Sequence, residues 1–120
     1  MGKKLIFVLV VDSLMREFLI DFFAMQGFII VNVYLENLDT KLKEYQLQKK
    51  LKYDLFLITD KFFFEKIKLE ILNKIVNIFV CSVIENKNQN KKDNVIYLDN
   101  FSLHNLKKVI NKINGSVGIN

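Results

Sequence analysis

The chain has 120 residues, 51% of them hydrophobic, and a formal net charge of +5. This length suits one domain with a single core. No apolar run is long enough for a membrane span, so we expect neither a membrane anchor nor a signal peptide. Cys81 is the only cysteine, which excludes an internal disulfide. Its apolar surroundings predict a small core residue in a reducing, cytoplasmic compartment.

The positive charge alone does not indicate a nucleic-acid partner. The basic residues are scattered along the chain and have acidic residues among them. The sequence has no arginine-rich helix, no alternation of aromatic and basic residues and no zinc-ligand spacing. We therefore expect no specific binding to nucleic acid.

Five short apolar runs have the length of β-strands. The run at 53–60 (Tyr-Asp-Leu-Phe-Leu-Ile-Thr-Asp) is continuously apolar between its acidic ends, as in a strand buried on both faces at the centre of a parallel sheet. The five predicted strands are 5–11, 28–35, 53–60, 78–83 and 95–98.

Between the strands, apolar residues recur at intervals of three and four, which predicts helices. The first helix follows Asp12 and Ser13 and stops at Gly27, where a left-handed backbone is wanted. Asn37 or Asp39 can cap a second helix.

The predicted helices after the central strand are less alike. Apolar residues at 64, 67, 71 and 75 predict a third helix, whereas the polar stretch 85–94 predicts a solvated loop. Ser102 should cap a closing helix that ends at Gly115, followed by a mobile tail at 116–120. Strands that alternate with helices predict one α/β domain at 1–115, with helices on both faces of a parallel sheet.

Four segments, in this order, resemble the receiver domain of two-component response regulators, the chemotaxis-type flavodoxin-like fold. They are 11–19 (Val-Asp-Ser-Leu-Met-Arg-Glu-Phe-Leu), 53–60, 77–82 (Asn-Ile-Phe-Val-Cys-Ser) and 97–103 (Tyr-Leu-Asp-Asn-Phe-Ser-Leu). The resemblance implies a three-layer α/β/α sandwich with a five-stranded parallel sheet in the order 2-1-3-4-5. The stretch between Ser82 and Tyr97 is short and polar, so the fourth helix of that fold should be short or missing.

Receivers carry out phosphoryl transfer with five groups. Two acids after the first strand hold Mg²⁺, which prefers oxygen ligands. An aspartate that ends the third strand attacks the phosphoryl group. A Ser or Thr that ends the fourth strand and a Lys that ends the fifth bind the phosphoryl oxygens. An aromatic residue on the fifth strand rearranges to signal the change.

The resemblance places Val10 and Val11 at the positions of the two acids, with Asp12 one residue further on. In the gapless alignment Thr59 takes the position of the phosphoacceptor, and Asp60 is the candidate acceptor one residue beyond it. Asp12 and Asp60 are also the only candidate Mg²⁺ ligands. Each of the two aspartates has a structural alternative as the N-cap of the helix that follows it.

The remaining positions are matched in part. Ser82 matches the hydroxyl position, or else it bonds to nearby backbone as an ordinary strand-end residue. Tyr97 matches the aromatic switch, or else it is a half-buried strand aromatic. Asn100 stands at the lysine position, and it brings no positive charge to a phosphoryl group.

These substitutions predict an atypical receiver, a signalling module that binds a protein partner, such as a sensor kinase or a downstream regulator, without a cofactor. One alternative is a phosphorylatable receiver that uses Asp60 with Mg²⁺. Another is a small-ligand-binding domain of the same fold, although the chain lacks a Gly-rich turn after a strand. No set of residues indicates an enzyme active site, and the oligomeric state is open.

Overall fold

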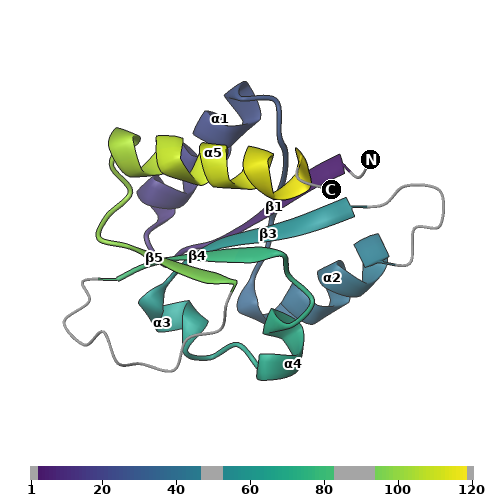
Figure 1. Ribbon diagram of the computed structural model, residues 1–120. Helices are drawn as coiled ribbons and strands as arrows, with labels where there is room; N and C mark the ends of the chain where they lie inside the picture. The colour runs from purple at the N-terminus through teal and green to yellow at the C-terminus, as the bar shows by residue number, and fades with distance from the viewer. Residues whose placement is uncertain (1–2, 47–52, 83–93, 119–120) are drawn as a thin grey trace.

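The computed structural model describes residues 3–46, 53–82 and 94–118. Five parallel strands form one sheet in the order β2-β1-β3-β4-β5, which confirms the predicted fold class. Figure 1 shows the carboxyl ends of the strands pointing to the left. The strands are β1 (Lys3–Leu9), β2 (Ile29–Asn32), β3 (Tyr53–Asp60), β4 (Asn77–Cys81) and β5 (Val95–Leu98).

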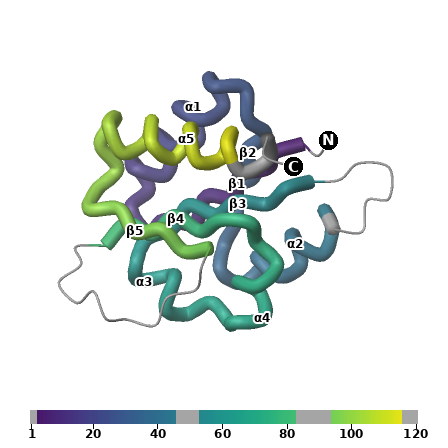
Figure 2. The backbone as a smooth tube through the Cα atoms, in the orientation of Figure 1, coloured from purple at the N-terminus to yellow at the C-terminus, as the bar shows by residue number. Residues whose placement is uncertain are grey.

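Helices cover both faces of the sheet and so make three layers (Figures 1 and 2). Because side chains alternate along a strand, β3 sends Phe56 and Ile58 to one face and Leu55 and Leu57 to the other. The first pair packs with helices α1 (Ser13–Met25) and α5 (Leu103–Gly118). The second pair packs with α2 (Leu38–Gln46) and the short helices α3 (Lys61–Phe64) and α4 (Leu69–Leu72).

The strands predicted for β1 and β2 extend beyond the observed strands at their carboxyl ends. β1 ends at Leu9, not at Val11, because the Val11 amide leaves the sheet and donates to the Asp60 carboxylate at 2.7 Å. β2 ends at Asn32, before the chain turns through a short 3-10 helix (η1, Leu35–Asn37). The central strand β3 has the predicted bounds.

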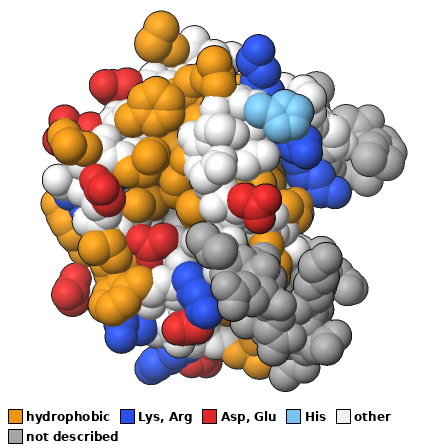
Figure 3. Space-filling view, turned by 90° about the vertical axis from the view of Figure 1, so that its left-hand side faces the viewer, with side chains coloured by type: hydrophobic (Ala, Val, Ile, Leu, Met, Phe, Trp, Pro, Cys, Tyr) orange, Lys and Arg blue, Asp and Glu red, His pale blue; other side chains and the backbone are white. Residues whose placement is uncertain are grey.

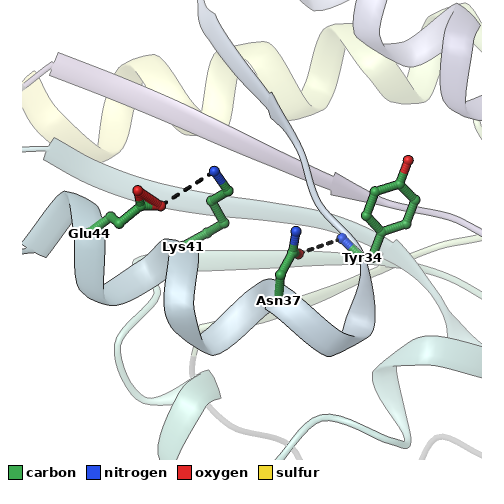
Figure 4. A network of polar contacts seen from close by, with 4 residues as sticks. All are labelled: Tyr34, Asn37, Lys41 and Glu44. Atoms are coloured by element: carbon green, nitrogen blue, oxygen red, sulfur yellow. Dashed lines mark hydrogen bonds and ion pairs between the residues drawn. The ribbon is translucent and has the colours of Figure 1, made fainter.

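The predicted caps lie at helix ends, with one exception. The Asp12 carboxylate accepts from the Met15 amide at the start of α1, and Gly27 follows that helix with a φ of 92°. The Asn37 side chain instead accepts a hydrogen bond from the Tyr34 amide at 2.8 Å, and so caps the start of η1 (Figure 4). Asp39 lies within the first turn of α2.

The predicted third helix through residues 64, 67, 71 and 75 is wrong as a single element. The chain forms two single turns, α3 and α4, with an extended residue, Lys68, between them (φ −68°, ψ 146°). In a continuous helix Lys68 would lie four residues after Phe64 and three before Ile71, on the apolar stripe. The break leaves Lys68 exposed and still buries Ile67 and Ile75, and this avoids burying an ammonium group.

The closing helix is longer than predicted. Ser102 accepts from the Asn105 amide at 3.2 Å, as expected of its cap, but α5 continues past Gly115 to Gly118. Gly27 is the only described glycine with a positive φ. Gly115 therefore lowers helix propensity without ending the helix. Part of the predicted tail at 116–120 is thus helical.

Two expectations concern residues that the structure does not describe. The predicted polar loop at 85–94 and the missing fourth helix fall almost wholly on residues 83–93, outside the described ranges. Within those ranges, no helix has both the length and the apolar character needed to cross a membrane.

Candidate functional site

An open cleft of about 490 Å³ lies at the carboxyl edge of the sheet, where the chain leaves β1, β3 and β5. This is the edge at which open α/β sheets bind their ligands. Three of the six predicted site residues line the cleft, and most of the other lining side chains are apolar. The lining residues are Val10, Val11, Asp12, Met15, Asp60, Cys81, Asn100 and Phe101.

Asp60 ties two segments together across this edge. One carboxylate oxygen, Oδ2, accepts from the Val11 amide at 2.7 Å, and the other, Oδ1, accepts from the Phe63 amide at 2.9 Å. The second bond makes Asp60 the N-cap of α3, which confirms the structural alternative for this residue. Both oxygens of the candidate phosphoacceptor are therefore engaged by backbone.

Thr59 has no access to the cleft. Its side chain is fully buried, and its hydroxyl donates to the carbonyl of Leu9, its register partner on β1, at 2.6 Å. A buried hydroxyl that is satisfied in this way strengthens the pairing of β1 with β3. Thr59 thus presents no nucleophile to the cleft, whereas each oxygen of the Asp60 carboxylate accepts one backbone hydrogen bond.

Asp12 and Asn100 line the cleft, but helix starts engage both side chains. Asp12 Oδ1 accepts from the Met15 amide at 3.0 Å, so Asp12 caps α1. Asn100 Oδ1 accepts from the Ser102 amide at 2.9 Å and from the Asn105 side-chain amide at 3.0 Å. The residue at the lysine position therefore organises the turn into α5.

Ser82 and Tyr97 lie outside the cleft lining. Ser82 is buried, and its amide donates to the Leu98 carbonyl at 2.8 Å, which adds one bond beyond β4. Tyr97 is half-buried on the other face of the sheet, edge-on to Phe64 with 6.3 Å between ring centroids. Ser82 is therefore not among the residues that line the cleft with Asp12 and Asp60.

Cys81 packs against the core, as predicted, but it is only partly buried and also lines the cleft. It ends β4 beside its register partner Asp60, and it is partly exposed because the strand here borders the cleft. Its Sγ lies 3.9 Å from the Asp99 carbonyl oxygen. Burial raises the pKa of the Cys81 thiol, and the charges of Asp60 and Asp99 raise it further, so the thiol is protonated at neutral pH.

The residues of the cleft do not fit a Mg²⁺ ion. Among residues 3–46, 53–82 and 94–118, no group of three His, Cys, Asp or Glu side chains is placed to hold a metal. Both Asp60 oxygens and one Asp12 oxygen already accept backbone hydrogen bonds. The aliphatic side chains of Val10 and Val11 supply none of the further oxygen ligands that Mg²⁺ needs.

Exposed apolar side chains lie at the same edge of the sheet as the cleft. We call Val11, Leu14, Phe62 and Leu103 the carboxyl-edge face, since each lies just after a strand or in the first turn of a helix that follows one. Each of these residues is more than half exposed. Figure 3 looks onto this edge and shows hydrophobic side chains gathered there beside acidic ones.

The three consecutive phenylalanines of α3 differ in their exposure. Phe63 and Phe64 pack on the core, whereas Phe62 remains 56% exposed. The carboxyl-edge face as a whole was missed from the sequence. Its members look like ordinary core residues in their own segments, and only the short turns after β1, β3 and β5 place them together.

Comparison with known proteins adds no relative. No family model matches the chain, and neither the curated proteins nor the solved structures contain a match.

We predict that Asp60→Ala destabilises the domain by roughly 2–3 kcal/mol, because two backbone amides lose a charged acceptor. Asp12→Ala, which removes a single exposed cap, should cost about 1 kcal/mol. Urea denaturation of both variants measures the difference. If Asp60→Ala lowers the free energy of unfolding by no more than Asp12→Ala does, the two hydrogen bonds of Asp60 do not stabilise the domain as we predict.

We also predict the pH dependence of the reaction of Cys81 with iodoacetamide. The midpoint of its rate profile should lie at higher pH than that of an ordinary thiol, since the thiolate is the reactive form and the pKa of Cys81 is raised. Asp99→Asn removes a negative charge that disfavours the thiolate, so the rate profile should move to lower pH. Asp21→Asn, an equal change of charge on the exposed side of α1, should leave the profile in place. An unchanged profile in Asp99→Asn speaks against this electrostatic coupling.

Proposed function

We propose that this chain is a cytoplasmic protein-binding module with a receiver-like fold that works without phosphoryl transfer. Its binding surface is the carboxyl-edge face. By the resemblance of its segments to receivers, its partner is a sensor kinase or a downstream regulator of a two-component system.

The state of Asp60 carries this proposal. Its two oxygens hold the amides of Val11 and Phe63, at 2.7 and 2.9 Å. Attack on a phosphoryl group needs an oxygen free to approach phosphorus and a cation to offset the charge that develops. Asn100 replaces the cationic residue, and its side-chain oxygen is bonded to the start of α5. The Asp60 carboxylate therefore stabilises the fold and does not accept a phosphoryl group.

The carboxyl-edge face supports the binding part of the proposal. Exposed apolar side chains at the starts of α1, α3 and α5 lie at the same edge of the sheet as the cleft, whose own lining is mostly apolar. Contiguous apolar surface of this kind marks a site of protein interaction. Asp12, Asp60 and Asp99 lie at the same edge, so a partner with apolar and basic residues would complement it.

The first test asks whether the site takes up a phosphoryl group. We expect no saturable amide shifts at Thr59, Asp60 or Cys81 when beryllofluoride and Mg²⁺ are added to the labelled protein. Intact mass after treatment with acetyl phosphate should also be unchanged. A phosphorylatable receiver treated in parallel confirms the reagents. An adduct that forms on the wild type and is lost in Asp60→Asn would overturn the proposal.

The second test addresses the surface. Leu14→Ser combined with Leu103→Ser should weaken binding to a cognate kinase or regulator by about tenfold or more, as expected for central apolar contacts. Met25→Ser combined with Leu69→Ser is the matched control, because both residues are at least 60% exposed and lie away from this edge. Two-hybrid and calorimetric measurements compare the pairs. Equal weakening by the control pair, or binding to none of these proteins, would contradict the proposal.

A further inference from the structure

A second recess lies between α2 and the α3–α4 segment. We call it the α2–α4 groove. It has a volume of about 560 Å³, within the range of about 300–1,000 Å³ typical of ligand sites. Figures 1 and 2 show α2 and α4 beside each other on one face of the sheet, away from α1 and α5. The floor of the groove is aliphatic and consists of Leu35, Leu38, Ile67 and Ile71.

The groove follows from the broken helix. A continuous helix from 61 to 75 would lie along the sheet beside α2 and would fill the space between them. Instead α3 and α4 are each a single turn, and the extended Lys68 carries the chain from one to the other. The short elements leave Leu35 and Ile71 partly exposed in the floor of the groove, whereas Leu38 and Ile67 are buried.

Lysines dominate the rim. Lys43, Lys66, Lys68 and Lys74 line the groove, against the two acids Asp39 and Glu70.

The acids compensate only part of this charge. Asp39 is shared between two ammonium groups, with Lys43 at 3.3 Å and Lys74 at 3.9 Å. Lys66 lies 4.5 Å from the centre of the Phe62 ring. Within the described parts of the chain, neither Lys66 nor Lys68 makes an ion pair with a carboxylate. The rim therefore keeps a positive potential over an apolar floor.

We propose that the α2–α4 groove binds an acidic peptide segment of a partner protein that carries an aliphatic side chain. The aliphatic side chain covers the floor of the groove. Carboxylates on either side of it meet the ammonium groups of Lys66 and Lys68, which are free to turn toward them. Desolvation of the floor supplies binding energy, and the charges select the partner and speed the encounter.

Other anionic ligands suit this groove less well. Single-stranded nucleic acid is held by aromatic side chains on which its bases stack, and none of the described residues that line the groove is aromatic. Inorganic phosphate would meet the lysines but would leave the aliphatic floor exposed to water. A peptide that combines acidic and aliphatic residues satisfies both parts of the surface.

The experiment uses a fluorescein-labelled peptide, Glu-Asp-Leu-Glu-Asp-Leu-Glu-Asp, and measures its anisotropy with the full chain. We expect saturable binding that weakens as salt is added, and amide shifts confined to the groove. Lys66→Glu combined with Lys68→Glu should weaken binding by about tenfold or more. Lys107→Glu combined with Lys108→Glu, exposed lysines of α5 on the opposite face, makes the same change in net charge and should have about a twofold effect at most.

Absence of peptide binding would overturn the proposal. Equal binding of a peptide with serine in place of leucine, or equal weakening by the α5 variant, would also overturn it. So would tighter binding of oligo(dT) or inorganic phosphate than of the peptide. The inference does not depend on the carboxyl-edge face, because the Leu14→Ser, Leu103→Ser protein should bind the peptide as the wild type does. Failure at one surface is therefore distinguishable from failure at the other.

Discussion

The carboxylate of Asp60 holds together the edge of the sheet on which the candidate site is built. One oxygen stops the chain after β1 by taking the amide of Val11, and the other starts α3 by taking the amide of Phe63. A charged acceptor that satisfies two backbone donors is among the stronger tethers available to a small domain. Beneath it, the buried hydroxyl of Thr59 bonds to Leu9 and joins the same two strands. These contacts set where the loops around the cleft begin.

The chain resembles receivers in its fold, but the side chains at the positions of the receiver's reactive groups have structural roles here. A receiver needs a free carboxylate, oxygen ligands for Mg²⁺ and a cation at one edge. Here the carboxylates of Asp12 and Asp60 act as helix caps, and Asn100 organises the start of α5. The space between them is lined by Val10, Val11 and other apolar side chains. Such an edge is better suited to apolar contact with a protein than to reaction with a charged phosphoryl group.

The proposed acidic-peptide site arises at a different place and from a different cause. α3 and α4 together cover less of the sheet than one helix would, and the positions left open are flanked by lysines. The two surfaces adjoin, because Lys66 on the rim of the groove lies 4.5 Å from the centre of the Phe62 ring, which belongs to the carboxyl-edge face.

The sequence by itself determined the fold class, because hydrophobic periodicity depends on local geometry. Continuous apolar runs mark strands buried on both faces, as in β3, and caps such as Asp12 and Ser102 mark helix starts. It also placed Asp12, Asp60 and Asn100 near the ends of strands, where the cleft lies. Local patterns did not reveal the break at Lys68, since the spacing of its neighbours suits one helix and only packing against the sheet penalises the lysine.

Only the tertiary structure decided what the site residues do. That Asp60 binds the Val11 amide depends on the register of β1 against β3, between residues 49 positions apart in the chain. Cys81 borders the cleft because β4 ends beside Asp60, and Tyr97 packs on Phe64 because side chains alternate between the two faces along β5. The carboxyl-edge face and the α2–α4 groove likewise join side chains from separate segments. Local sequence specifies strands and caps, whereas contacts between distant segments depend on how the whole sheet is assembled.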